Sequence, residues 1–255
     1  ALLASGLLDA LLDKGYRYAM TANSDNLGAA PSARIAGWFA ASGAPYAPEM
    51  CRRTPADVKG GHLAVRKSDG RIILRDTAQT PEDQMHYFTD QFRHPFFHTN
   101  NLWFDLKVLR DTLADRGGIL GLPLIRNSKT VDPADSSSTP VIQLETAMGA
   151  AVEAFEGATA IEVPRSRFLP VKTTNDLLLV RSDVYEVDDD GLLQMVPDQA
   201  CTVSLDPRFY KKIQDFEARF PNGVPSIKDA QSLTVEGDWT FGADVVATGE
   251  AHVEA

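Results

Sequence analysis

The sequence is poor in cysteine, with only Cys51 and Cys201 among 255 residues. They lie far apart and form no CxxC pair, which excludes a dense disulfide framework. Since nothing in the pattern requires a disulfide, we predict a protein of the reducing cytoplasm. The five histidines also lack the spacing of zinc ligands, both with one another and with the cysteines.

Long apolar runs are absent as well. No stretch of about 18 apolar residues occurs, which is the length that a membrane-spanning helix needs. The apolar first 15 residues are interrupted by Asp9, Asp13 and Lys14 at helical spacing, and no signal-peptide cleavage site follows them. They predict an amphipathic helix that ends at Gly15.

Basic residues are outnumbered, because 25 lysines and arginines stand against 35 acidic residues and give a formal net charge of −10. This balance argues against a nucleic-acid backbone or an anionic membrane as a partner. A protein of this charge can still bind phosphate groups. It then needs local cations, backbone amides or a metal ion.

Short strands and helices are predicted along most of the chain. Residues 16–22 are typical of a buried strand, residues 31–42 of a helix, and residues 62–66 and 71–75 of a hairpin. Residues 81–90 and 107–115 are helix-like, and residues 131–138 indicate a surface loop. Leu144, Ala147, Ala151 and Phe155 have helical spacing and predict a helix over residues 143–156. Residues 177–184 fit either a strand or the start of a helix.

The texture of the sequence changes after Cys201. Residues 206–220 predict a helix with Ile213, Phe216 and Phe220 on one face. From residue 224, glycines at positions 237, 242 and 249 separate short strands rich in valine and threonine. This pattern predicts coils of a β-solenoid.

Polar residues 23–26 follow the first predicted strand. Ligands of open α/β sheets bind beyond the carboxyl ends of strands. Asp25 is suited to hold Mg²⁺ at phosphate groups, and Asn23 to bond a sugar or ribose hydroxyl. The same residues also fit an Asx turn that satisfies its own backbone.

Three further segments could bind a phosphorylated sugar. The first has Arg52, Arg53 and Lys59 before Gly60 and Gly61, where a backbone can approach a ligand closely. The second, residues 98–103, contains asparagines that can bond hydroxyls. The third is a local basic patch in an acidic protein, formed by Arg165, Arg167 and Lys172. Each segment taken alone also fits an ordinary surface loop.

Six segments carry a resemblance to a known family. They are Asn23-Ser-Asp-Asn-Leu-Gly-Ala, Lys59-Gly-Gly-His, Asp76-Thr-Ala-Gln, Thr99-Asn-Asn-Leu-Trp, Gln143-Leu-Glu-Thr-Ala-Met-Gly-Ala and Arg167-Phe-Leu-Pro-Val-Lys-Thr-Thr-Asn-Asp-Leu-Leu. In this order they resemble successive motifs of the eukaryotic-type UDP-glucose pyrophosphorylases, or UTP–glucose-1-phosphate uridylyltransferases. The resemblance extends over residues 6–249.

The resemblance implies an α/β fold. The expected core is a Rossmann-like, GT-A-like nucleotidyltransferase with a mixed sheet, followed by a left-handed β-helix. Residues 1–205 would form the C-terminal part of the catalytic domain, residues 206–223 a linking helix, and residues 224–255 the beginning of the β-helix. The glycine-rich UTP loop and a Gly-His-Gly-Asp segment are expected upstream of Ala1. We therefore expect the C-terminal portion of a longer enzyme, inactive alone.

The resemblance also implies a reaction, the Mg²⁺-dependent transfer of a uridylyl group from UTP to glucose 1-phosphate. The products would be UDP-glucose and pyrophosphate, formed in line without a covalent intermediate. By motif position, Asp25 would hold the metal, Asn23 would contact the nucleotide sugar, and Lys172 would be the catalytic residue at the phosphates. The implied glucose contacts are Gly60, Gly61, Asp76 and Asn100.

Two departures from the family pattern concern the sugar, because His98 stands where we expect Asn and Asp76 where many members have Glu. One alternative is therefore a pyrophosphorylase for another sugar 1-phosphate, such as an N-acetylhexosamine. The other is a non-catalytic fragment whose β-helix assembles a homo-oligomer.

Overall fold

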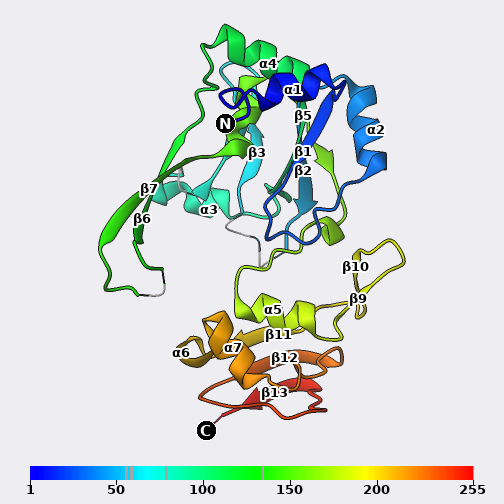
Figure 1. Cartoon of the computed structure of the whole chain (residues 1–255), viewed down its shortest axis with the longest axis vertical. Helices are drawn as coiled ribbons and strands as arrows, with labels where there is room; N and C mark the ends of the chain where they lie inside the picture. The colour runs from blue at the N-terminus through cyan, green and yellow to red at the C-terminus, as the bar shows by residue number, and fades with distance from the viewer. Residues whose placement is uncertain (55–56, 58–59, 78–79, 134, 255) are drawn as a thin grey trace. The chain divides into compact units, whose positions relative to one another are not determined.

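The computed structural model describes residues 1–54, 57, 60–77, 80–133 and 135–254. The chain divides into two compact units (Figure 1). The N-terminal unit comprises Ala1–Asn23 and Pro31–Pro164, and the C-terminal unit comprises Ser24–Ala30 and Arg165–Ala255. This division does not follow the segment boundaries expected at residues 205 and 223. The functions assigned to those segments stay predictions.

A four-stranded mixed sheet lies at the centre of the N-terminal unit (Figure 1). Its strands lie in the order β1 (Tyr18–Thr21), β5 (Phe96–Asp105), β2 (Tyr46–Arg52) and β8 (Ile161–Glu162). β5 runs antiparallel to both β1 and β2, whereas β8 runs parallel to β2. The strand expected at residues 16–22 is confirmed as β1, but it is a half-exposed edge strand rather than a buried one. The mixed α/β architecture agrees with the expected fold class.

The N-terminal unit also contains helices. They are α1 (Leu7–Asp13), α2 (Ala33–Ser42), η3 (Glu82–Gln84), α3 (Met85–Phe88), α4 (Leu106–Asp115) and the 3₁₀ helix η4 (Met148–Ala154). Of these, α4 and η4 contact this sheet, and α1 contacts α4. Asp105, the last residue of β5, accepts from the N–H groups of Lys107 and Val108 and so begins α4. Its other carboxylate oxygen bonds Arg17 at 2.8 Å, just before β1. One carboxylate thus joins β1, β5 and α4.

Among the described residues, no helix combines the length and the apolar character that crossing a membrane requires.

Two hairpins complete the N-terminal unit. The predicted hairpin is confirmed as β3 (His62–Val65) and β4 (Ile72–Arg75), with Gly70 in the left-handed region at φ 72°. A longer arm is formed by β6 (Leu124–Thr130) and β7 (Pro140–Thr146), and Figure 1 shows it extending from the body of the unit.

The helix predicted over residues 143–156 is wrong in its first part. Residues 143–146 belong to β7, and η4 begins only at Met148. Leu144 is 61% exposed, so it does not belong to a buried helical face with Ala151 and Phe155. Leu144 has helical spacing to the apolar residues of η4 only by chance. Pairing of residues 143–146 with β6 favours a strand over the helix that this spacing predicted.

A three-stranded parallel sheet, in the order β11-β12-β13, organises the C-terminal unit. The elements of this unit are η5 (Arg165–Arg167), α5 (Thr174–Arg181), β9 (Tyr185–Val187), β10 (Leu193–Met195), β11 (Thr202–Leu205), α6 (Pro207–Tyr210), α7 (Ile213–Arg219), β12 (Ala230–Val235) and β13 (Gly249–Val253). Leu205, Val235 and Val253 lie side by side in register. These three strands form a parallel sheet, and the β-solenoid expected from residue 224 onward stays a prediction.

The helical part of this unit differs from expectation in two places. Residues 177–184, which fitted a strand or a helix, lie mostly in α5, because Thr173 and Asp176 form a capping box at its start. The helix expected over residues 206–220 is two short helices, separated where Lys212 adopts an extended backbone.

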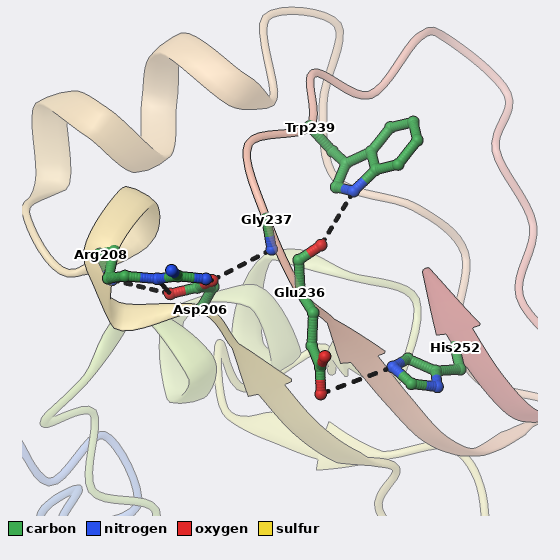
Figure 2. A network of polar contacts seen from close by, with 6 residues as sticks. All are labelled: Asp206, Arg208, Glu236, Gly237, Trp239 and His252. Atoms are coloured by element: carbon green, nitrogen blue, oxygen red, sulfur yellow. Dashed lines mark hydrogen bonds and ion pairs between the residues drawn. The ribbon is translucent and has the colours of Figure 1, made fainter. Parts of the chain in front are cut away.

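Asp206 anchors the turn after β12 (Figure 2). Its carboxylate bonds the Arg208 guanidinium at 2.6 Å and accepts from the N–H of Gly237 at 3.0 Å. The Trp239 indole donates to the carbonyl of Glu236, whose carboxylate lies 3.7 Å from His252. The hydrogen bonds from Arg208 hold the pKa of the Asp206 carboxyl well below its usual value.

We predict that Asp206→Asn lowers the Tm at pH 7 by a few degrees. Because the carboxyl pKa is lowered on folding, its stabilising contribution is present above the unfolded-state value of 3.8 and is lost as pH falls through the folded-state value. The difference in Tm from the wild type, followed by circular dichroism, should therefore shrink on acidification. Asp229→Asn, at an exposed aspartate of the same unit, is the control. An equal Tm for Asp206→Asn and wild type at pH 7 contradicts the anchoring role.

Candidate functional site

Two segments of the C-terminal unit that are distant in sequence pair through an isolated antiparallel β-bridge between Asn26 and Pro170. The Val171 N–H donates to the carbonyl of Asp25 at 2.8 Å, and the Leu27 N–H donates to that of Leu169 at 3.0 Å. Lys172 directly follows Val171. The predicted metal ligand and the predicted catalytic lysine therefore lie on neighbouring segments of one unit.

The side chain of Asn26 fastens this pairing. It is 6% exposed, and its Oδ1 accepts from the N–H groups of Leu169 at 2.8 Å and Gly28 at 3.2 Å. Its Nδ2 donates to the carbonyl of Arg167 at 3.1 Å. The Asx turn that was the alternative interpretation of residues 23–26 is thus present at Asn26, and it leaves the neighbouring Asp25 side chain outside the turn. Sequence reasoning missed this role of Asn26.

Gly28 allows the two segments to touch. A Cβ atom added there would lie 2.4 Å from the carbonyl oxygen of Ser166 and 2.9 Å from the backbone nitrogen of Phe168. Both are backbone atoms, so no side-chain rotation can relieve the overlap. A glycine is therefore required where residues 24–30 pass residues 165–168.

Asp25 and Lys172 have side chains that are available to a ligand. Asp25 is half-buried and Lys172 is exposed. Within the described part of the chain, neither side chain forms a hydrogen bond or an ion pair. The Asp176 carboxylate already accepts from the backbone N–H groups of Lys172 and Thr173 at the start of α5. A phosphate here would consequently meet the lysine ammonium rather than the backbone N–H groups of Lys172 and Thr173.

A second group of predicted residues gathers in the N-terminal unit, at the end of β1. The Asn100 side-chain N–H donates to Asn23 Oδ1 at 2.7 Å. Asn100 has φ 64°, in the left-handed region that asparagine tolerates better than most residues. Its backbone N–H donates to His98 Nδ1 at 3.1 Å.

Gly61 joins this group to Asp76. The His98 backbone N–H donates to the carbonyl of Gly61 at 2.7 Å. A Cβ atom added at Gly61 would lie 3.3 Å from Asp76 Oδ2, so this carboxylate lies against the glycine. Asp76, Gly61, His98, Asn100 and Asn23 therefore form one continuous set, drawn from four separate segments of the sequence.

His98 occupies the position where the family pattern has Asn. Because Nδ1 accepts from Asn100, the proton of the neutral ring is on Nε2. Nε2 is buried, and a Cβ atom at Gly149 would lie only 2.8 Å from the His98 ring. Burial lowers the pKa of His98 to about 4. This imidazole is therefore neutral near pH 7.

The backbone of Gly60 accepts a hydrogen bond from a buried arginine, Arg53. Arg53 donates to the carbonyls of Gly60 and Phe88, and it lies 3.4 Å from His62 Nδ1. His62 is 1% exposed and stacks on His94 with ring centroids 3.8 Å apart. Arg53 thus supports the glycine pair rather than facing a ligand.

The other cations of the first basic segment are placed differently. Arg52 forms an exposed ion pair with Glu162. Lys59 lies outside the described residues.

Neither of two cavities of the N-terminal unit includes the predicted residues. One of about 380 Å³ is lined by Met50, Arg93 and Glu162 among others. One of about 610 Å³ is lined mainly by apolar residues of the segment before α1, of α4, of the loop after α4 and of η4. The candidate sugar residues instead include Asn23, just after β1, and Asn100, within β5.

One group of three metal-ligating side chains occurs in the described part of the chain: Glu236, His252 and Glu254, all exposed. Asp25 is not part of a ready-made metal cluster. A cation at Asp25 would need ligands from water or from a bound phosphate.

Comparison with known proteins gives the family. A family model described as UTP–glucose-1-phosphate uridylyltransferase matches residues 1–247. The enzyme of this name from Solanum tuberosum is 40% identical, covering 100% of the chain and 52% of the relative; that from Saccharomyces cerevisiae is 39% identical, covering 98% and 49%. The chain spans about half the length of the curated relatives it matches.

Solved structures agree. A UDP-glucose phosphorylase from Trypanosoma brucei has a TM-score of 0.86 at 44% identity, covering 98% of the chain and 54% of that structure. A mutant UDP-glucose pyrophosphorylase from Leishmania major, in complex with UDP-glucose, has a TM-score of 0.83 at 45% identity, covering 98% and 55%. Fold and relatives together define the class of nucleotidyltransferases. Within this class, the chain belongs to the UTP–glucose-1-phosphate uridylyltransferase family.

We predict that Gly28→Ala destabilises the C-terminal unit by about 1–3 kcal/mol, because the added methyl group forces two backbone segments apart. Thermal unfolding should show the loss, and hydrogen exchange should show weaker protection of the Val171 amide. Gly37→Ala is the matched control: Gly37 lies in α2 with open space around it, so alanine should be neutral or slightly stabilising. Unchanged stability of Gly28→Ala would show that the close approach is not required.

The buried histidines predict acid sensitivity of the N-terminal unit. Burial, His94 and the nearby arginines lower the pKa of His62 to about 3, from an ordinary 6.5. The unfolded chain therefore binds more protons between these values, and stability falls as pH drops below about 6.5. The limiting slope is about 1.4 kcal/mol per pH unit for each histidine.

The measurement is Tm against pH from 7.5 to 5 for wild type and His62→Phe, which removes the titrating ring. The variant should show a shallower decline, whereas His252→Phe, at an exposed histidine, should follow the wild type. The same slope in His62→Phe and wild type refutes the buried neutral state.

Proposed function

We propose that the protein acts in the synthesis of UDP-glucose, transferring the uridylyl group of UTP to glucose 1-phosphate and releasing pyrophosphate. The observation that carries this proposal is the pairing of the Asp25 segment with the Lys172 segment. It supplies a carboxylate for a cation and an ammonium for phosphate groups within one unit.

The sugar is assigned to the N-terminal unit. The amides of Asn23 and Asn100 offer donors and acceptors, and Asp76 offers an acceptor beside Gly61. Hydroxyl groups of a hexose require this mixture. The choice of glucose rests on the family motifs and on the names of the relatives, and a panel of sugar 1-phosphates with pyrophosphate release as the readout separates it from an N-acetylhexosamine.

The reaction needs no protein nucleophile. A phosphate oxygen of glucose 1-phosphate attacks the α-phosphorus of UTP, and a new P–O bond forms. The bond from this phosphorus to the oxygen that bridges to the β-phosphate breaks, and pyrophosphate leaves with the electron pair. Lys172 would bond phosphate oxygens and stabilise the charge that builds up in the transition state.

Mg²⁺ fits this site as a shared ion. Mg²⁺ is commonly held by one or two carboxylates together with substrate phosphates and water. Asp25 provides one half-buried carboxylate that carries no other hydrogen bond within the described residues. When bound, the ion would neutralise phosphate charge, and Asp25 would hold it.

Further observations support the finer parts of the proposal. The parallel ladder of β11, β12 and β13 supports the start of a left-handed β-helix, through which copies of the protein could assemble. The two buried, free cysteines support a reducing cytoplasm. No Leu-Gly-Gly-Leu-Gly-type loop occurs in these 255 residues, so we infer that UTP binding requires a further segment.

We predict that Lys172→Ala lowers turnover about 10²–10³-fold in an enzyme that joins this chain to the UTP-binding segment of its family. The assay is pyrophosphate release with UTP, glucose 1-phosphate and Mg²⁺. Lys211→Ala, at an exposed lysine of the same unit, should retain full activity. More than about a tenth of the wild-type rate in Lys172→Ala excludes the proposed role.

A further inference from the structure

A buried carboxylate lies beneath the candidate sugar residues. Glu49, in β2, is 0% exposed. Its Oε2 accepts from the Asn101 side-chain amide at 3.0 Å, and its Oε1 accepts from the Trp103 indole at 2.9 Å. Burying a carboxylate is costly unless it receives such bonds, and an apolar residue at this position would avoid the cost. The position of Glu49 therefore calls for a reason other than stability.

The register of the sheet gives that reason. Pro48 pairs with Leu102 and Met50 pairs with His98, so β2 advances two residues while β5 advances four. The additional residues of β5 form a bulge opposite Glu49, with Asn100 at its centre in the left-handed conformation. Bulges of this kind re-aim side chains, often beside active sites.

Glu49 bonds both flanks of this bulge. The Thr99 hydroxyl donates to the Glu49 carbonyl at 2.8 Å, and it accepts from the Asn101 N–H at 3.2 Å. The Glu49 carboxylate bonds the Asn101 side chain and, two residues further, Trp103. The residues before and after Asn100 are thereby fixed, while the Asn100 amide reaches Asn23 at 2.7 Å.

We propose that Glu49 is a positioning residue for the sugar site, which holds the β5 bulge so that Asn100 presents its amide beside Asn23. This inference rests on the proposed function. Glu49 touches no substrate and acts through Asn101 and Thr99. Loss of its negative charge should release Asn100 from its strained conformation and weaken sugar binding, with no direct effect on UTP.

The test is Glu49→Gln in the enzyme that carries the UTP-binding segment. Glutamine keeps the size of the side chain but offers one oxygen, so the Asn101 amide or the Trp103 indole must face an N–H group. The KM for glucose 1-phosphate should rise about tenfold or more, because a small displacement of the Asn100 amide weakens its hydrogen bond to the sugar. The KM for UTP should stay unchanged. Glu162→Gln, at an exposed glutamate of the neighbouring strand β8, should leave both constants unchanged.

A double-mutant cycle separates positioning from a general structural role. If Glu49 acts through Asn100, the variant Glu49→Gln/Asn100→Ala should have the same KM for glucose 1-phosphate as Asn100→Ala alone. Additive effects, or an equal rise in the KM for UTP, overturn the proposal. Should Glu49→Gln fail to fold, Trp103→Phe removes one bond to the same carboxylate and should shift the sugar KM in the same direction; an unchanged sugar KM overturns the proposal.

The positioning role of Glu49 can be tested separately from the proposed function. If wild-type enzyme turns over no sugar 1-phosphate, the proposed function fails. The side-chain amide resonances of Asn100 still report on its position in the isolated chain, and in Glu49→Gln they should move toward values of an exposed, mobile amide. Identical resonances in Glu49→Gln and wild type overturn the positioning role in either case.

Discussion

The close backbone pairing of residues 25–27 with residues 169–171 is the constraint on which the account depends. It joins segments that are more than 140 positions apart in sequence, and it forms because Asn26 bonds across the pair and Gly28 leaves room for it. Neither segment has a regular element of its own at this point. Their mutual hydrogen bonds give each a fixed backbone, and this is what gives Asp25 and Lys172 defined positions. The proposed phosphate chemistry needs both.

In the N-terminal unit, too, hydrogen bonds between distant segments hold an irregular backbone that positions the candidate residues. There, a bulge in β5 places Asn100 against Asn23, and the backbone of His98 draws Gly61 and Asp76 into the same group. Two charged residues next to this group, Glu49 and Arg53, are buried, so their charges do not face solvent. The hydrogen bonds of Glu49 hold the β5 bulge around Asn100, and those of Arg53 hold the backbone of Gly60. A regular strand or turn would not present the candidate sugar residues in this way. We infer that the buried charges of Glu49 and Arg53 serve to shape the candidate site.

Local sequence reasoning succeeded where one chemical signal determined the structure. Gly70 marked the β3–β4 hairpin, and the polar residues after β1 marked the end of a strand. It failed at residues 143–146, where helical spacing coincided with an exposed strand that only its partner β6 stabilises. The local pattern also gives no sign that the separate segment Ser24–Ala30 belongs to the C-terminal unit, because this depends on contacts with residues 165–171. Pairings between distant residues leave no mark in the local pattern.

Within the candidate site, the motifs identified the residues but not their supports. The roles of Asn26 and Glu49 depend on atoms contributed by residues 141 and 52 positions away in sequence, respectively. The most direct test of the central claim is an experimental structure of the protein with UDP-glucose and Mg²⁺ bound. The account predicts the Lys172 ammonium within about 3 Å of a phosphate oxygen, with the Asp25 carboxylate on the metal. A nucleotide sugar bound elsewhere, with Lys172 directed to solvent, would contradict it.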